Sequence, residues 1–328
     1  MRAAAGASAL CVSALALGLT APGSSAVAWP GRPFSPHSVW NARLGADAPV
    51  ARDSRRLVRN LVGQVQAAHG SWLNTWQYSV PVYVVGDHQH RVKVSLDTED
   101  PSLQRAFDSV PIPRDARPAL GSDAQLTVWQ PGRDLMWDFW KLHREADGWH
   151  ARWGGEMTNV SRNPGYFENQ AGPLNWGATA TGLPLLGGLI TFNDLRRGYI
   201  DHAVSLAIPH TEARYWVWPA QRTDGDISAD AGTAIPEGTQ FRLDPHIDLR
   251  TLGLSGLALM IARAAQRYGV IVRDKAGAVT FYGQAPTGGR HPWNEAFGDR
   301  YPNQALAGFP WGDLQALKAP AHCCWAPH

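Results

Sequence analysis

The segment from Trp137 to Gly155, WDFWKLHREADGWHARWGG, places an acidic side chain, Asp138, among four of the chain's 15 tryptophans. Burial beside indole rings disfavours the charged form of a carboxyl group and raises its pKa toward the range that a general acid needs. Indole faces are also flat apolar surfaces on which a pyranose ring can stack. The segment therefore predicts a sugar-binding cleft in which Asp138 is a catalytic residue.

The same segment alternates as a β-hairpin does, with Asp147-Gly148 in its turn. Through a turn of two or four residues, one face gathers Met136, Asp138, Trp140, Leu142, Trp149, Ala151 and Trp153. The opposite face gathers Trp137, Phe139, Lys141, His143, His150 and Arg152. Asp138 is the only charge on the first face, and the predicted substrate-binding surfaces there are Trp140, Trp149 and Trp153. A second interpretation stays open, in which Asp138 hydrogen-bonds an indole N–H or loop backbone inside the core.

Two reaction types fit these residues. A glycoside hydrolase needs a second carboxylate beside Asp138, and the candidates are Glu156, Asp201 and Asp224. In a polysaccharide lyase, His202 or a tyrosine abstracts the proton α to a uronate carboxylate, which Arg242 or Arg222 neutralises. Each of these residues also has a non-catalytic interpretation. His202 can be a hydrogen-bonded core residue, and the arginines can form structural or surface pairs. The chain has no nucleophile elbow, zinc-binding helix motif, phosphate-binding loop or calcium loop, so we predict neither a cofactor nor a metal site in its body.

Composition narrows the class of partner. The 328 residues carry a formal net charge of +2 without a cluster of Lys and Arg, which argues against a nucleic-acid partner. The 15 Trp, 33 Gly and 24 Pro favour a loop-rich β architecture. Two adjacent cysteines, Cys323 and Cys324, lie in the C-terminal tail, where a strained vicinal disulfide, a link to another chain and metal binding all remain open.

Residues 1–28 have the pattern of an export signal. Arg2 precedes an apolar run that is too short to span a membrane, and Ala26-Val27-Ala28 forms a cleavage site of small residues before Trp29. No later stretch is long enough to span a membrane either. We therefore expect a secreted, extracellular protein whose residues 29–328 form a single globular domain with a loose C-terminal tail.

Periodicity predicts the elements that must position these residues. Helices are expected over 53–70, 102–110 and 255–269. Strands are expected over 77–86, 91–97, 124–130, 200–209, 215–221 and 239–244, with a further hairpin over 270–283. The Gly-, Pro- and Asn-rich segment 159–188 is expected to be a long ordered loop. The predicted fold is therefore mainly β, an antiparallel β-sandwich or jelly-roll-like body with a few peripheral helices.

Several segments of the C-terminal half carry a resemblance: GLPLLGGL, GYIDHAVSLAIP, YWVWPAQRTDG, AIPEGTQFRLDP and RYGVIVRD. In this order they resemble a family of bacterial secreted proteins with a Gly-Leu-Pro loop, an Ile-x-His-Ala strand, a Trp-Pro-Ala segment, an Arg-Leu strand and a Tyr-Gly turn. The chain departs from that pattern at Thr179-Ala180-Thr181, where the family has a Ser-Ala-Asp-type stretch. The resemblance implies export and one globular unit, and it implies no particular reaction.

The sequence as a whole predicts a secreted carbohydrate-active enzyme, a glycoside hydrolase or polysaccharide lyase, whose partner is a polysaccharide or cell-wall glycan. Two alternatives belong to other classes. One is a non-catalytic protein that binds glycan or cell wall through its tryptophans. The other is a structural exported domain whose tryptophans are simply core.

Overall fold

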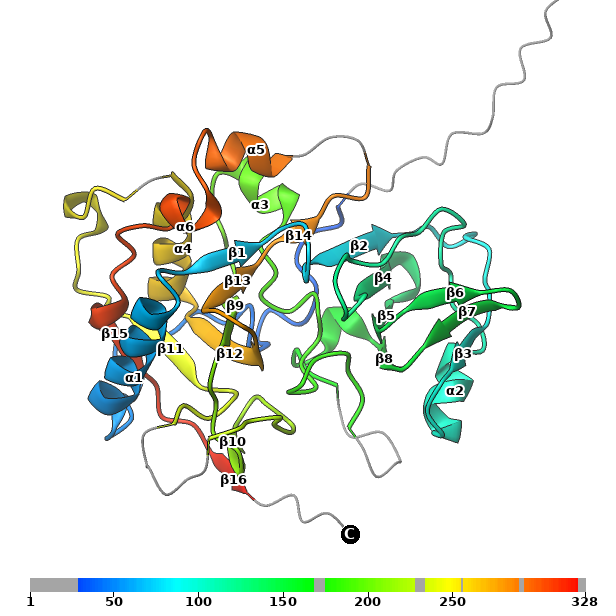
Figure 1. Cartoon of the computed structure of the whole chain (residues 1–328), viewed down its shortest axis with the longest axis horizontal. Coiled ribbons are helices and arrows are strands. Elements are labelled where there is room, and N and C mark those ends of the chain that lie inside the picture. Colours follow the sequence, from blue (N-terminus) through cyan, green and yellow to red (C-terminus); the bar gives the residue numbers. More distant parts are fainter. Residues whose placement is uncertain (1–28, 168–174, 228–233, 255, 289–291, 324–328) are drawn as a thin grey trace, which may run out of the picture.

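The computed structural model describes residues 29–167, 175–227, 234–254, 256–288 and 292–323 (Figure 1). The fold is mixed α/β, with 22% helix and 27% strand in four sheets that contain parallel and antiparallel pairs, and none of the sheets is closed. The prediction of a clean antiparallel sandwich or jelly roll is therefore wrong. The predicted export signal, residues 1–28, lies outside the described residues.

The largest sheet has six strands, in the order β1 (Trp72–Asn74), β13 (Thr280–Tyr282), β9 (Val204–Ile208), β12 (Val270–Lys275), β11 (Gln240–Leu243) and β15 (Leu314–Ala316). β9 is buried along its whole length and lies between β12, which is parallel to it, and β13, which is antiparallel. The expected hairpin over 270–283 is therefore wrong. Its two arms are both strands, but each pairs with β9 instead of with the other.

Two helices predicted from apolar spacing cover this sheet. α1 (Ser54–Ala67) packs on β15, and α4 (Gly256–Arg267) packs on β11 and β9. Most of the buried apolar side chains of these helices and of the sheet form one hydrophobic cluster, whereas Ala207, Ile271 and Tyr282 of the sheet belong to a second one. Shorter helices lie beside them: α3 (Phe192–Arg197), α5 (Pro292–Phe297) and α6 (Pro302–Ala305).

The second sheet has five strands, in the order β14 (Gln284–Ala285), β2 (Val80–Val84), β4 (Leu126–Gln130), β5 (Leu135–Trp140) and β8 (Trp153–Thr158). The middle residues of β5 are buried on both faces, because α2 (Pro101–Phe107) packs against β8 and loops cover the other side. These side chains form a second hydrophobic cluster. The chain passes back and forth between the two large sheets, since β14 directly follows β13.

Two small sheets complete the fold. One contains β3 (Val94–Leu96), β7 (Gly148–Ala151) and β6 (His143–Glu145); the other pairs β10 (Tyr215–Val217) with β16 (Ala321–Cys323). The C-terminal segment is therefore not a loose tail as far as residue 323, because it forms a strand with β10. Cys324 lies outside the described residues.

In the tryptophan-rich segment, side chains alternate between the two strand faces as predicted, but the segment does not form one continuous hairpin. Asp138 opposes Gly155 and Trp140 opposes Trp153 in one antiparallel pair, and His143 opposes His150 in another. Lys141, with a φ of 54°, interrupts the strand between the two pairs, so the expected single hairpin is divided between two sheets.

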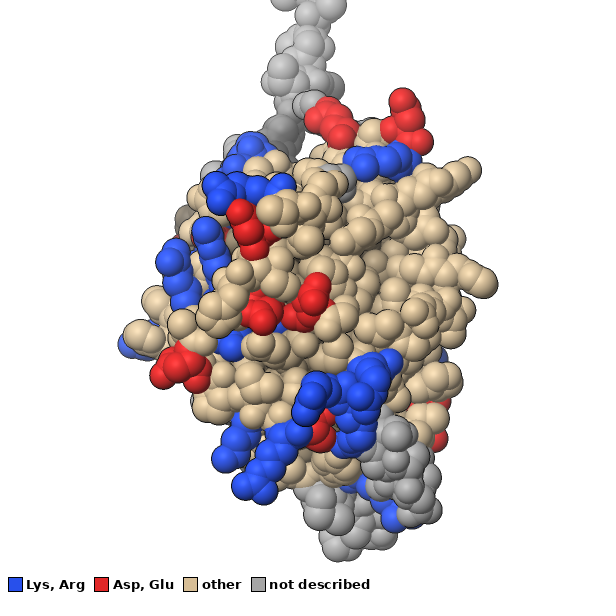
Figure 2. Space-filling model, turned by 90° about the vertical axis from the view of Figure 1, so that its left-hand side faces the viewer, with Lys and Arg blue, Asp and Glu red and all other residues tan. Residues whose placement is uncertain are grey.

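No helix within the described part of the chain is both long and apolar enough to cross a membrane. On the side of the molecule that carries α1 and β15, positive and negative side chains are both present and lie interspersed among uncharged surface (Figure 2).

Candidate functional site

Asp138 lies in the middle of β5 and is fully buried. Thr127 Oγ1 donates a hydrogen bond of 2.6 Å to Asp138 Oδ1, and the backbone N–H of Leu185 donates one of 2.7 Å to Oδ2. Burial raises the pKa of Asp138 to about 6, although these two hydrogen bonds and the charge of Arg273 oppose the shift. The pKa shift predicted from the indole-rich segment is present, but the expected open groove over this carboxyl group is not.

The Gly-Leu-Pro loop, residues 182–188, is what covers Asp138. Its Leu185 peptide is held from both sides, because the N–H bonds to Asp138 and the C=O accepts a hydrogen bond of 2.8 Å from Arg273 Nη1. Arg273 belongs to β12, where the pairing with β9 shifts between Val272 and Asp274. Such a bulge turns a side chain out of the regular alternation. Asp138 and Arg273 thus connect the two large sheets through one loop. This agrees with the second interpretation of Asp138, in which its carboxyl group hydrogen-bonds loop backbone inside the core.

His202 is 9% exposed, and both of its ring nitrogens have acceptors. Its Nδ1 lies 2.8 Å from the carbonyl oxygen of Ala203, and its Nε2 lies 3.3 Å from Asp194 Oδ2. Burial disfavours the charged imidazole, but the charge of Asp194 and the hydrogen bond to it outweigh burial and raise the pKa of His202. Because both ring nitrogens already face acceptors of the protein itself, neither is free to take a proton from a substrate, and this geometry does not suit the proton abstraction predicted for His202.

The two predicted arginines hold backbone. Arg242, on β11, donates to the carbonyl oxygens of Gly45 and Ala46 and to Gln315 Oε1. Arg222 donates to four carbonyl oxygens in the segment preceding the Gly-Leu-Pro loop: Asn175, Gly177, Thr179 and Ala180. Asp138, His202 and Arg242 share no hydrogen-bond partner in the described chain, so the predicted catalytic set is not brought together.

The ion pair between Asp194 and His202 makes stability depend on pH. Although burial opposes it, the charge of His202 and hydrogen bonds from His202 and Thr191 lower the pKa of Asp194 from 3.8 to about 2. The ionised Asp194, through His202 and Thr191 together, therefore contributes about 2 kcal/mol above pH ~4, and this contribution is lost as the pH falls through about 2. The part of this contribution that comes from charged His202 is also lost as the pH rises through the raised pKa of His202.

We expect Asp194→Asn to remove this contribution. The pKa shifts of Asp194 and His202 describe the same interaction, so their free energies are not added. Urea unfolding at pH 3, 6 and 9 measures it. The difference in unfolding free energy between the wild type and Asp194→Asn should be largest at pH 6, whereas a difference that is constant with pH would contradict the assignment.

A cleft with a volume of about 470 Å³ does lie beside the covered acid. Trp140 and Trp153, cross-strand neighbours at the end of the β5–β8 pair, lie on one side of it. Trp140 Nε1 donates a hydrogen bond of 3.3 Å to Asp123 Oδ1, and Lys141 Nζ lies 4.6 Å from the centre of a Trp140 ring. These contacts hold the Trp140 ring in place. Trp149, by contrast, is buried and does not line the cleft.

The rest of the lining of the cleft carries charges of both signs, with Arg222 and Lys275 beside three acids. Asp224 and Asp274 line it, and each offers a carboxylate oxygen within 4.8 Å of the other and of one from buried Glu237. Burial raises the pKa of Asp274 to about 7 despite the opposing charge of neighbouring Arg273. Burial, followed by the charges of Asp224 and Asp274, raises the pKa of Glu237 well above its usual value.

These three carboxyl groups have two chemical capacities. Glu237 Oε2 accepts a hydrogen bond of 3.3 Å from the Asp224 N–H, whereas its Oε1 has no hydrogen-bond partner in the described chain. A protonated acid beside an ionised one can transfer a proton to and from a substrate. Fully ionised, the same three groups form an oxygen donor set of the kind that suits Ca²⁺.

Sequence reasoning found part of this site. Trp140, Trp153, Arg222 and Asp224 were predicted, and the cleft brings them together. The other proposed second carboxylates lie elsewhere: Asp201 pairs with Arg197, and Glu156 lines a different hollow. Asp123, Glu237 and Asp274 were missed. For Asp274 the available signal was a charged pair, Arg273 and Asp274, directly after the apolar run VIV of an expected strand.

No protein-family model matches the chain, and neither a curated protein nor a solved structure matches it. The resemblance to a family of bacterial secreted proteins therefore stays a prediction, and the functional argument depends on the geometry of the cleft.

Proposed function

We propose that the protein is an exported carbohydrate-active enzyme that hydrolyses a glycosidic bond in the cleft described above. The observation that carries this proposal is one cleft lined by two indoles and by an acid whose pKa is raised to about 7, Asp274, with Asp224 next to it. Trp140 and Trp153 offer stacking surfaces to sugar rings, and the two carboxyl groups flank the bond to be cleaved.

The roles of the two acids follow from their surroundings. Asp274 is partly buried and has the raised pKa, so it acts as the general acid, while exposed Asp224 acts as the carboxylate nucleophile. Their separation, within 4.8 Å between ligand oxygens, is closer to the ~5 Å of retaining glycosidases than to the wider spacing of inverting ones.

The reaction then has two balanced steps. Asp224 attacks the anomeric carbon, the glycosidic C–O bond breaks, and Asp274 gives its proton to the leaving oxygen. A water molecule next attacks the glycosyl–Asp224 ester; Asp274 takes a proton from that water, and Asp224 leaves as a carboxylate. Both groups return to their starting protonation states.

The second candidate function is glycan binding without chemistry. It is favoured by the way in which Asp123 and Lys141 hold the Trp140 ring, because a fixed flat surface serves binding whether or not the acids react. A panel of polysaccharides, assayed for new reducing ends and for retention of the protein on the same glycans, separates the two. Retention without new reducing ends supports binding alone.

We expect Trp153→Ala to weaken glycan affinity by about fivefold, since stacking on an aromatic ring contributes about 1 kcal/mol. Affinity electrophoresis or titration calorimetry measures the change. The control is Trp76→Ala, which removes a tryptophan that is 53% exposed and does not line the cleft. Equal losses in both variants would argue against stacking in this cleft.

Removal of divalent cations tests whether Asp224, Glu237 and Asp274 act in hydrolysis or bind a cation. Hydrolysis by the proposed pair should be unchanged in EDTA. Activity that disappears in EDTA and returns with Ca²⁺ would instead assign Asp224, Glu237 and Asp274 to a cation site.

A further inference from the structure

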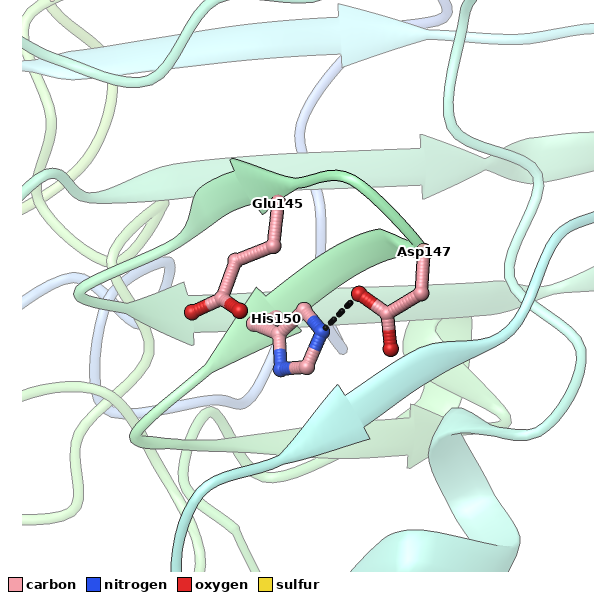
Figure 3. A group of neighbouring side chains, drawn as sticks. All are labelled: Glu145, Asp147 and His150. Carbon is pink, nitrogen blue, oxygen red and sulfur yellow. Dashed lines mark hydrogen bonds and ion pairs between the residues drawn. The ribbon is translucent and has the colours of Figure 1, made fainter.

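Four potential metal ligands lie close together on the hairpin formed by β6 and β7. The strands are joined by a two-residue turn of Ala146 and Asp147, since Glu145 pairs with Gly148. Glu145, Asp147 and His150 each place a ligand atom within 4.8 Å of the others. Figure 3 shows the imidazole of His150 lying between the two acids, with Asp147 bonded to it.

Each histidine of the hairpin has one nitrogen anchored and the other directed at a carboxylate. His150 Nδ1 lies 3.4 Å from Asp97 Oδ1, and its Nε2 lies 2.9 Å from Asp147 Oδ1. His143 opposes His150 across the strands, with its Nδ1 3.0 Å from the Lys141 carbonyl oxygen and its Nε2 3.2 Å from Glu145 Oε1. Metal-bound histidines typically donate their second ring N–H to a carboxylate or a backbone carbonyl, which fixes the ligating nitrogen.

The separations also suit a coordination sphere. Ligand atoms that bind one ion at about 2 Å lie roughly 3 Å apart, and the Nε2–carboxylate separations on both strands are of that size. The ring centroids of His143 and His150 are 5.6 Å apart, and the His143 side chain is 43% exposed, so His143 is a neighbour of the three grouped ligands with room to turn. The site opens directly to solvent through Asp147 and Glu145.

We propose that this hairpin binds a divalent transition-metal ion, with Zn²⁺ as the reference ion, through His150, Asp147, Glu145 and His143. Imidazole nitrogens combined with carboxylate oxygens favour Zn²⁺, Ni²⁺ or Cu²⁺ over Ca²⁺ and Mg²⁺. Asp97 is the positioning residue that orients His150. None of these residues lines the cleft that contains Trp140 and Trp153, so the metal site and the proposed hydrolysis are independent.

The test is calorimetric titration of the untagged full chain, reduced and stripped of metal, with Zn²⁺ and separately with Ca²⁺. We expect one Zn²⁺ per chain at this hairpin and no matching Ca²⁺ binding. His150→Ala should weaken Zn²⁺ binding at least about tenfold, and Asp97→Asn by about tenfold. Co²⁺ should give visible absorption bands that are absent in His150→Ala.

Two controls keep the result specific. His210→Ala removes another exposed histidine that is paired with an acid, Asp226, and it should leave Zn²⁺ affinity unchanged. The double variant Cys323→Ser/Cys324→Ser removes the thiols of the C-terminal segment and should also bind one Zn²⁺. Circular dichroism confirms that each variant is folded. Binding that survives in His150→Ala, or that is lost with the cysteines, overturns the proposal.

Discussion

Asp274→Asn is expected to lower the rate of glycan hydrolysis by about 10²- to 10⁴-fold, the usual contribution of a positioned general acid. An amide can occupy the place of Asp274 in the cleft but cannot give a proton to the leaving oxygen. Reducing-end assays under saturating substrate measure kcat. The retention of the protein on the same glycan should be nearly unchanged, since Trp140 and Trp153 remain in place.

The pH profile gives a second readout of the same assignment. Because Asp274 must be protonated to act as an acid and its pKa is about 7, kcat should fall as the pH rises above about 7. The matched control is Asp248→Asn, which changes an exposed acid paired with Arg250, and neither of these two residues lines the cleft. A wild-type rate for Asp274→Asn, or an equal loss for Asp248→Asn, would remove Asp274 from the mechanism.

Asp138→Ala is expected to lower the free energy of unfolding by about 3 kcal/mol. The substitution leaves the Leu185 N–H and the Thr127 hydroxyl without their buried acceptor, and each unpaired group costs about 1–3 kcal/mol. It also releases one side of the loop that Arg273 holds from the other sheet. Denaturation in guanidinium chloride measures the change, and Asp138→Asn should lose less because an amide still forms hydrogen bonds.

Asp138 also gives a pH signature that is independent of activity. Its folded pKa of about 6 lies above the usual value of 3.8, so the folded state binds the proton more tightly than the unfolded state. Its contribution therefore favours folding below pH ~4 and is lost as the pH rises through about 6, by about 3 kcal/mol in all. Asp138→Asn should remove this slope and keep hydrolysis intact. Loss of hydrolysis in a stably folded Asp138→Asn would return Asp138 to the catalytic set.

The periodicity of apolar residues predicted those features that depend on a single helix or strand. The apolar spacing of α1 and α4 predicted two helices that the structure contains, with bounds close to those observed. Alternation correctly placed Trp140 and Trp153 on one face with Asp138, because the two-residue turn at 146–147 preserves the expected parity. Sequence could not show that β9 separates β12 from β13, since pairing between distant strands leaves no local pattern.

The amino-acid sequence by itself determined which residues share a strand face and therefore which tryptophans could meet. Only the tertiary structure decided that the Gly-Leu-Pro loop covers that face over Asp138 and leaves it open over Trp140 and Trp153. Only the tertiary structure, likewise, brought Asp224, Glu237 and Asp274 together from segments far apart along the chain. The physical reason is that alternation depends on neighbouring residues alone, whereas burial, and with it the pKa of a carboxyl group, depends on what the rest of the chain packs against it.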